Sequence, residues 1–587
     1  MVRVLTLSIL GALLIGCAST DSATRQSSQT APGATAEPEQ VAKVLERPIP
    51  DESLYPLLVA EFALRRRAYH VALDQYMEQA PVLRDKKVAK HTTRLAQFMQ
   101  QDEEALSAVQ LWLELEPDNV EAHTTAATML TRQGGNLEAL PHLAVVARSG
   151  EQANFPSLLT DFETLDPADQ ASLAQGIGEL ALEFPDDPAL LLTRAMLSVQ
   201  QQEYDTALDE LGQLFAIEPT QPQALLLEAR VLIATEADAP YARIEKTLKN
   251  KPDDTRLRLQ YARLLTATDM SAARQQFEIL SAQSPRDGDL LLSLALINRE
   301  TGDHLAAKAY LKQMLELEQR VDEAHYYLGR VAEDTDDPKE AVAQFKQVGE
   351  GRHFLSANQR LGRLLVDAGA LEQSHALFEQ QRGTHKQYRE QLYGIEADLL
   401  TNAGFPGSAM AVLNAGLEDF PDSASLRYTR SMLGEKQNNL ALMEADLRII
   451  IANDPANTTA LNALGYTLAD RTERYTEAYD LISRALELSP EEPAILDSMG
   501  WVLYRQGEYE QALQYLTRAY AAFPDPEVAA HLGEVLWVNG NTDEATLIWR
   551  GALLQAPDHK TLIATLKRLG VDRDQFTTLP GRPQVSQ

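Results

Sequence analysis

The sequence contains a single cysteine, Cys17, among its 587 residues. A chain with one thiol cannot form an internal disulfide, so packing must stabilise its folded state. Aromatic residues are also scarce, at 6%, while leucine and alanine are abundant, and this balance favours helices over sheets. After the apolar run at the amino terminus, no segment approaches the roughly 20 consecutive apolar residues that a membrane-spanning helix needs.

The motifs of common enzyme classes are missing from the sequence as well. It has no HExxH zinc motif, no GxxxxGK[ST] phosphate-binding loop and no GxSxG nucleophile elbow. Its eleven histidines are dispersed, and the acidic run that begins at Asp334 lacks the glycine and the final glutamate of a calcium-binding loop. We therefore expect no catalytic residue, no metal site and no cofactor.

Basic residues are the minority among the charges. The 53 lysines and arginines stand against 85 acidic residues, for a net charge of −32 and a pI near 4.8. Such a surface repels phosphate backbones, so we expect no nucleic-acid partner. The acidic residues are scattered, and two interpretations are open. They keep a large helical surface soluble, or part of them forms an acidic binding face.

The amino terminus is typical of an exported lipoprotein. Arg3 and the apolar run 4–15 in MVRVLTLSILGALLIGCAST match a signal peptide, and the run is too short to span a bilayer. It ends in LIGC, which resembles the bacterial lipobox. The resemblance implies cleavage after residues 1–16 and acylation of Cys17 by fatty acids such as palmitate. Ala18 resembles the class retained at the outer membrane, facing the periplasm. The alternative is an ordinary secretory signal with an incidental cysteine.

Two terminal segments differ in composition from the rest of the chain. Residues 17–50 are rich in Ser, Thr, Ala, Gln, Pro and Glu, and residues 570–587 end in TTLPGRPQVSQ. Segments of this kind bury too little apolar surface to order themselves. We predict a disordered tether at the amino end, a flexible tail at the carboxyl end, and one folded region at 51–569 between them.

Prolines in the folded region recur at a near-constant interval. Ten of them stand at positions 117, 185, 219, 252, 285, 421, 455, 490, 524 and 557, so that successive gaps within this set are 33 to 35 residues, or two or four times 34. A small residue comes twelve positions before many of them, at Ala105, Ala207, Ala273, Ala409, Ala478, Ala512 and Ala545. A fixed period of this length is typical of a repeat architecture.

One unit, residues 495–528, shows why the interval is kept. Apolar residues recur at helical spacing from Leu496 onward and predict a first helix. A turn with glycine follows, and a second apolar stripe begins at Ala512. Gly500 and Ala512 are small because the two antiparallel helices approach closest there. Pro524 ends the second helix because it lacks a backbone donor and clashes with the preceding turn.

Several units resemble the tetratricopeptide repeat, among them NALGYTLADRTERYTEAYDLISRALELSP, DSMGWVLYRQGEYEQALQYLTRAYAAFP and HLGEVLWVNGNTDEATLIWRGALLQAP. The resemblance implies an all-α fold, a superhelical solenoid of antiparallel helix pairs over 51–569. Leu496 and Leu503 stand where the family consensus has tryptophan and tyrosine. The signature is lost near 149–184, 235–251 and 352–390, where we expect irregular helices.

Aromatic residues gather on the first helices of three successive carboxy-terminal repeats, and the family lines its groove with these helices. They are Tyr466, Trp501, Tyr504 and Trp537, with Asn462, Asp497 and Glu534 as polar neighbours. Two interpretations are open. The residues form a strip that binds an extended peptide or a partner helix, or they wedge between neighbouring repeats as packing.

The first repeats are locally basic. Their basic residues are Arg65, Arg66 and Arg67 and, further on, Arg84, Lys86, Lys87, Lys90 and Arg94. They are either the solvated faces of helices or a docking surface for an acidic partner close to the tether.

The whole layout resembles a family of large outer-membrane lipoproteins. These are the binding partners of carboxy-terminal processing proteases, of the LbcA type that binds the protease CtpA, and the smaller NlpI lipoproteins are functionally related. The resemblance implies an adaptor with no enzymatic activity. It would bind a periplasmic serine protease and deliver peptidoglycan cross-link hydrolases to it. The protease would supply the catalytic residues. The alternative is an assembly lipoprotein for a secretin or an exopolysaccharide export machine.

Overall fold

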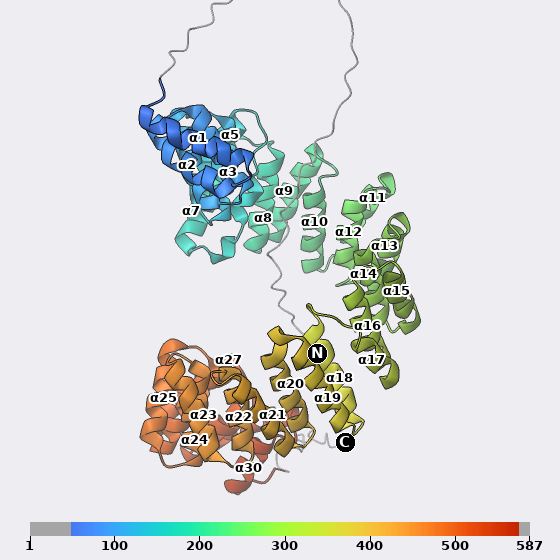
Figure 1. Ribbon diagram of the computed structural model, residues 1–587, viewed down its shortest axis with the longest axis vertical. Helices are drawn as coiled ribbons and strands as arrows, with labels where there is room; N and C mark the ends of the chain where they lie inside the picture. The colour runs from blue at the N-terminus through green and yellow to red at the C-terminus, as the bar shows by residue number, and fades with distance from the viewer. Residues whose placement is uncertain (1–47, 574–587) are drawn as a thin grey trace, which may run out of the picture. The chain divides into compact units, whose positions relative to one another are not determined.

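In the computed structural model, the structure describes residues 48–573, and helices account for every regular element in this range (Figure 1). The all-α prediction is therefore confirmed for this part of the chain. No helix within it is long and apolar enough to cross a membrane. The predicted signal peptide, Cys17, most of the predicted tether and residues 574–587 lie outside the described residues.

Two compact units divide the chain, Met1–Gln276 and Phe277–Gln587, and the boundary falls inside α13 (Met270–Gln283). The helices of the first unit are α1 (Asp51–Arg65), α2 (Tyr69–Leu83), α3 (Lys86–Phe98), α4 (Asp102–Leu115), α5 (Val120–Arg132), α6 (Asn136–Arg148), the 3₁₀ helices η1 (Phe155–Leu159) and η2 (Phe162–Thr164), α7 (Pro167–Glu183), α8 (Pro188–Gln200), α9 (Tyr204–Ile217), α10 (Pro222–Ala234), α11 (Ala242–Asn250) and α12 (Thr255–Leu265).

The second unit continues the same series. Its helices are α14 (Gly288–Glu300), α15 (His304–Glu316), α16 (Val321–Asp334), α17 (Pro338–Phe345), α18 (Phe354–Asp367), α19 (Leu371–Thr384), the 3₁₀ helix η3 (Lys386–Tyr388), α20 (Arg389–Asn402), α21 (Pro406–Asp419), α22 (Ala424–Lys436), α23 (Leu440–Asn453), α24 (Thr458–Arg471), α25 (Tyr475–Leu488), α26 (Pro493–Gln506), α27 (Tyr509–Ala522), α28 (Pro526–Val538), α29 (Thr542–Gln555) and α30 (Lys560–Arg568).

Within each unit, consecutive helices pack as hairpins. In the first unit α1 packs on α2, α3 on α4, α5 on α6 and α8 on α9. In the second unit the same holds from α14 with α15 to α28 with α29. The second helix of a pair also contacts the first helix of the next pair, as α25 contacts α26. Each unit is therefore a solenoid in which a pair covers the apolar face of its neighbour.

The prolines of the predicted grid end the second helices of the pairs. Pro219 stands two residues after the end of α9, and Pro524 stands two residues after the end of α27. A residue that precedes proline is disfavoured in the helical conformation, and these second helices end before it. Two residues further on, Asp187, Asn119 and Asn457 cap the next helix by accepting a backbone hydrogen bond.

The small residues of the grid lie where the helices touch. All seven predicted alanines, from Ala105 to Ala545, are 0% exposed. A Cβ added to Gly500 would lie 2.5 Å from Leu516 Cγ and 3.0 Å from the carbonyl oxygen of Ala512. At Gly500 the backbone of α26 therefore lies directly against α27, as the sequence predicts. A larger residue at this position would push the two helices apart.

Irregular structure occurs in two of the three segments where the repeat signature is lost, whereas the expected irregular helices are not found in the third, 352–390. Between α6 and α7 the chain forms two short 3₁₀ helices, and the fully buried Phe155 and Leu158 fill the space of a missing helix. In the segment 235–251, α11 has only 9 residues. The segment 352–390 contains α18 and α19 of ordinary length and a short 3₁₀ turn, η3.

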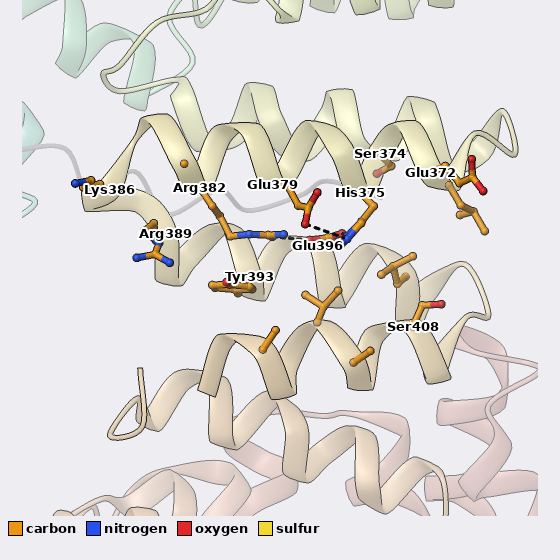
Figure 2. Close-up of a pocket in the computed structure, with 16 residues that line it drawn as sticks. Glu372, Ser374, His375, Glu379, Arg382, Lys386, Arg389, Tyr393, Glu396 and Ser408 are labelled. Carbon is orange, nitrogen blue, oxygen red and sulfur yellow. Dashed lines mark hydrogen bonds and ion pairs between the residues drawn. The ribbon is translucent and has the colours of Figure 1, made fainter. Parts of the chain in front are cut away.

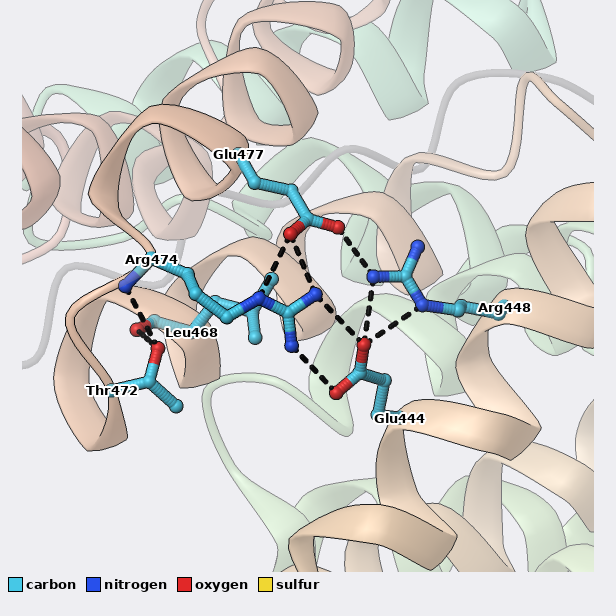
Figure 3. Close-up of polar contacts among 6 residues, drawn as sticks. All are labelled: Glu444, Arg448, Leu468, Thr472, Arg474 and Glu477. Atoms are coloured by element: carbon cyan, nitrogen blue, oxygen red, sulfur yellow. Dashed lines mark hydrogen bonds and ion pairs between the residues drawn. The ribbon is translucent and has the colours of Figure 1, made fainter.

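Charged residues on adjacent second helices also join neighbouring repeats. Arg474 contacts Glu444 of α23 at 2.8 Å and Glu477 of α25 at 2.6 Å (Figure 3). Arg448 of α23 contacts both of the same glutamates (Figure 3). The hydrogen bond from Arg474 lowers the pKa of Glu444. The four side chains are partly exposed, so each pair adds at most about 1 kcal/mol to the stability.

The last helix covers the end of the core. Leu562 and Leu566 of α30 are buried in the same cluster as the residues of α26 and α28. Val571, which we placed at the start of the flexible tail, is 8% exposed and belongs to this cluster too. The ordered chain thus extends past the end of α30 and closes the open face of the last repeat.

Candidate binding groove

A large cavity with polar side chains in its wall lies in the second unit. It has a volume of about 1400 Å³ and is lined by α22, α24, α26 and α28, the first helices of successive pairs, and by α30. Four of the seven predicted site residues line it, namely Asn462, Tyr466, Asp497 and Trp501. The helical period brings them to one face, because each occupies the inner side of its helix.

His531 of α28 is the centre of a cluster on this wall. Its ring stacks on Trp501 with centroids 4.2 Å apart. Its Nδ1 lies 3.0 Å from both carboxylate oxygens of Asp497, and its Nε2 lies 3.4 Å from the hydroxyl of Tyr466. The same hydroxyl is 3.4 Å from Glu527 Oε1. Side chains from three successive repeats are therefore locked into one polar network.

The environment shifts the pKa of two members of the network. Burial by itself lowers the pKa of His531. The charge and hydrogen bond of Asp497, together with the charges of Glu527 and Asp470, outweigh burial, and the net shift is upward. Burial raises the pKa of Tyr466, and the charge of Glu527 raises it further. The tyrosine therefore stays protonated and can donate a hydrogen bond, while the histidine favours its charged form beside Asp497.

Two polar atoms in the groove have no partner. Trp501 is only 5% exposed, and among the described residues nothing accepts a hydrogen bond from its Nε1. The Oδ1 of Asn462, one helix away, is also buried and has no donor in the described part of the chain. A buried polar atom without a partner costs about 1–3 kcal/mol. Both residues line the cavity, so a small movement of their side chains toward the groove would offer one donor and one acceptor to a bound molecule.

The other three predicted residues, Tyr504, Glu534 and Trp537, do not line the cavity. Tyr504 donates a hydrogen bond of 3.0 Å to Glu534, and Arg568 makes two contacts of 2.5 Å with the same carboxylate. Glu534 is 0% exposed, and burial raises the pKa of Tyr504 to about 12. Trp537 is half-buried and packs near Trp549, with ring centroids 5.6 Å apart.

His531 is one of the dispersed histidines, and neither it nor Arg568 was among the predicted site residues. A signal for both residues was present in the sequence. Asp497 and His531 are 34 residues apart, and so are Glu534 and Arg568. Residues one repeat apart occupy the same position on adjacent helices, so opposite charges at this spacing meet.

The charges around the groove are mixed, with an excess of acidic residues. The acidic lining residues are Glu435, Asp470, Glu492, Asp497, Asp525 and Glu527, and the basic ones are Arg471, Lys560 and Arg568. Apolar side chains such as Tyr428, Met432 and Phe523 lie between them. This surface suits a polypeptide with apolar and basic side chains.

A second cavity, of about 870 Å³, lies between α19, α20 and α21 (Figure 2). Arg382 and Glu396 are both buried there and are joined at 2.5 Å, and His375 lies 2.7 Å from the same carboxylate. The guanidinium of Arg382 also lies 4.2 Å from the centre of the Tyr393 ring. These charges satisfy one another, so this cavity has no unpaired buried polar atom comparable to those of the groove.

Comparison with known proteins places these features in a family. The sequence matches models described as tetratricopeptide repeat over residues 456–525 and over residues 299–351 and 498–558. It is 40% identical over 540 residues to the TPR repeat-containing protein PA4667 of Pseudomonas aeruginosa, an alignment that covers 91% of this chain and 90% of that protein.

Solved structures of similar proteins include other repeat proteins. The thermophilic TPR protein TTC0263 of Thermus thermophilus is 21% identical, with 31% of this chain and 100% of that chain covered and a TM-score of 0.28. Yeast Tom70 is 13% identical, with 88% of this chain and 95% of that chain covered and a TM-score of 0.32.

Helical hairpins that pack on one another in sequence order, with a groove on the first helices of the carboxy-terminal pairs, define a helical-repeat protein of the kind that binds other proteins. The identity and coverage of the Pseudomonas relative specify the family within that class. The chain belongs to the tetratricopeptide repeat family.

Proposed function

We propose that this chain is a scaffold that holds an extended segment of a partner protein in the groove of its carboxy-terminal repeats. The observation that carries this proposal is the pair of unpaired buried atoms, Trp501 Nε1 and Asn462 Oδ1, in the wall of a cavity of about 1400 Å³. The cavity exceeds the range of about 300–1,000 Å³ that is typical of small-molecule sites. A polypeptide segment is the ligand that fits this size.

The chemistry of the two atoms matches a peptide backbone. A peptide carbonyl can accept a hydrogen bond from Trp501 Nε1, and a peptide N–H can donate one to Asn462 Oδ1. These contacts do not depend on the side chains of the ligand, which would pack on aromatic residues such as Tyr466 and Tyr428. Specificity would come from the side chains and from the acidic rim.

We propose further that the chain is a lipoprotein of the outer membrane, acylated at Cys17 and facing the periplasm. The lipobox at the end of the apolar run supports this proposal. The resemblance to the LbcA type supports a carboxy-terminal processing protease as the partner and peptidoglycan hydrolases as the delivered substrates. The mechanism would be effective concentration, since molecules held on one scaffold meet more often than freely diffusing ones. The scaffold itself would have no catalytic activity.

Co-purification tests the identity of the partners. The full-length protein is purified in detergent from its own host, and bound proteins are identified by mass spectrometry. We expect a serine protease and wall hydrolases, and cells that lack the scaffold should accumulate a wall hydrolase. Recovery of secretin or exopolysaccharide-synthase subunits instead would replace this proposal with the assembly function. Incubation of the purified chain alone with casein and with peptidoglycan tests for catalytic activity, and hydrolysis of either would contradict the scaffold proposal.

A variant of the groove tests the site itself. Trp501→Phe keeps an aromatic ring on His531 but removes the N–H group, so binding of the co-purified partner should weaken about three- to tenfold. Trp537→Phe is the matched control, because Trp537 does not line the cavity. Thermal unfolding of both variants is measured in parallel. Equal affinities for the two variants would show that the groove does not bind the partner.

A further inference from the structure

The first helix of the solenoid exposes a row of large apolar side chains. On α1, Leu54 is 52% exposed, Tyr55 76%, Leu58 48% and Phe62 58%. At 100° per residue, these four positions fall within an arc of about 100° on one face of the helix. The opposite face of α1 is buried in the first hairpin. No earlier repeat precedes α1 in the described chain to cover the exposed row.

An unpaired cluster of arginines follows the apolar row. Arg65, Arg66 and Arg67 are exposed, and none of them forms an ion pair within the described residues. Arg65 lies on the same face of the helix as Leu54 and Leu58. In a chain with a net charge of −32, three free adjacent cations are unusual.

Most of the other basic residues of the first repeats are neutralised within the molecule. Arg84 contacts Glu114 at 3.0 Å and Lys86 contacts Glu116 at 2.7 Å. Lys90 and Arg94 share Glu121, each at 2.5 Å. The basic region that the sequence indicates thus has two parts, one that is paired with glutamates and one that is not. The part around α3 mostly binds neighbouring helices, and the arginines at the end of α1 remain available to a partner.

We propose that the exposed face of α1 lies on the surface of a lipid bilayer. Leu54, Leu58 and Phe62 would enter the boundary between headgroups and acyl chains, and Tyr55 would place its hydroxyl among the headgroups. Arg65, Arg66 and Arg67 would contact anionic phosphates. This inference rests on the proposed acylation of Cys17, which would hold α1 close to a membrane.

Three observations favour lipid over an acidic protein as the occupant. The face is a row of side chains that protrude from a single helix, so a protein would need a matching groove, whereas a bilayer needs none. The combination of leucine, phenylalanine and tyrosine with adjacent arginines is that of an interfacial helix. Only the 33 residues 18–50 separate Cys17 from the start of α1, a span of at most about 120 Å even when fully extended.

A fluorescent label on α1 tests the proposal. The full-length acylated protein has no free thiol, because acylation blocks Cys17, so Leu58→Cys introduces one labelling site. Leu182→Cys is the matched control, since Leu182 is 86% exposed on α7. Each labelled protein is reconstituted into vesicles of phosphatidylethanolamine with about a quarter of phosphatidylglycerol. We expect blue-shifted emission and quenching by brominated lipid at position 58 and neither at position 182.

Two further results decide the interpretation. Replacing all three arginines by glutamine should weaken docking about fivefold for each charge removed on anionic vesicles and leave docking on neutral vesicles unchanged. Equal lipid quenching at positions 58 and 182 would overturn the proposal. So would protection of position 58 from a water-soluble quencher without lipid quenching, which would indicate a protein partner or a second copy of the chain.

The same samples distinguish membrane binding through the exposed face of α1 from membrane binding through the proposed acyl group on Cys17. Intact mass reports acylation of Cys17 independently of the fluorescence. If the chain is not acylated, flotation of the same unacylated chain with anionic vesicles measures the affinity of the α1 face alone. Flotation that the three arginine substitutions abolish would support the contact, and absence of flotation would overturn it.

Discussion

Single residues set the distance between paired helices in this protein. A Cβ added to Gly533 of α28 would lie 2.1 Å from Trp549 Nε1, a distance that no real contact allows. At Gly551 of α29, by contrast, the nearest atom would be the hydroxyl of Tyr520 at 3.9 Å, an ordinary contact. Of the two glycines in this hairpin, Gly533 is therefore required for close packing and Gly551 is not.

The two glycines should respond in opposite ways to the same substitution. Gly533→Ala must move the large Trp549 ring, which is 0% exposed, so we expect a loss of about 1–3 kcal/mol in the free energy of unfolding. Gly551→Ala should gain about 0.5–1 kcal/mol, because alanine favours the helix over glycine. Chemical denaturation of both variants checks this. A similar effect at both positions would contradict the close approach at Gly533.

The groove histidine should make stability depend on pH. The pKa of His531 is raised in the folded state, so its contribution is fully present below the unfolded value of about 6.5 and is lost as pH rises through the folded value. Stability should therefore fall as the pH rises above about 6.5 and through the higher pKa of the folded state. Asp497→Asn should flatten this slope, since the main attractive charge is gone. Thermal unfolding at each pH measures it, and an unchanged slope in the variant would refute the role of Asp497.

At the scale of elements, one ion pair ties the last helix to the array. Arg568 of α30 holds the fully buried Glu534 of α28. Arg568→Ala leaves that carboxylate buried without a cation, and we expect a loss of about 2–3 kcal/mol, near the low end for such pairs because Arg568 is 55% exposed. Protease digestion should then cut first near α30. The double variant Glu534→Leu/Arg568→Met should recover most of the loss.

The network between α23 and α25 should behave differently because water reaches it. Glu444→Gln removes the shared acceptor of Arg448 and Arg474 (Figure 3). The exposed fractions of these side chains lie between 26% and 45%, so the cost should be below about 1 kcal/mol and should shrink further at about 1 M salt. Denaturation at low and high salt measures this, and a larger, salt-independent loss would show that the network acts as a buried one.

At the scale of the whole molecule, most packing contacts join neighbouring repeats, and the longest contacts of the groove reach only the second repeat along, from Tyr466 to His531. Damage should therefore stay local. Gly533→Ala should raise amide hydrogen exchange in α26 to α30 and leave exchange in α1 to α6 unchanged. Hydrogen exchange read by mass spectrometry resolves the two regions. A uniform increase along the chain would show that the solenoid unfolds as one cooperative body.

The sequence predicted the features of the fold that depend on short stretches of chain. Pro524 ends its helix, and Ala512 lets the two helices of its hairpin approach closely, whichever repeat lies next to them. The repeat period, the hairpins and the helix ends could therefore be predicted from the sequence. The resemblance to the repeat family indicated that Asn462, Tyr466, Asp497 and Trp501 lie on groove-lining helices, and these four residues line the cavity. It could not separate them from Trp537, because helical spacing alone does not say which aromatic residue a neighbour covers.

By itself, then, the sequence determined the stride of the repeat and the helical class, since proline geometry and the small size of alanine and glycine act locally. The tertiary structure decided which charged side chains form ion pairs with one another and which have no ion pair within the described residues. Glutamates of α4 and α5 neutralise most basic residues around α3, but none of the described carboxylates pairs with the arginines at the end of α1. It also decided that Trp501 Nε1 and Asn462 Oδ1 stay unpaired within the described chain. Burial and pairing depend on neighbours in space, which the order of residues specifies only through the folded chain.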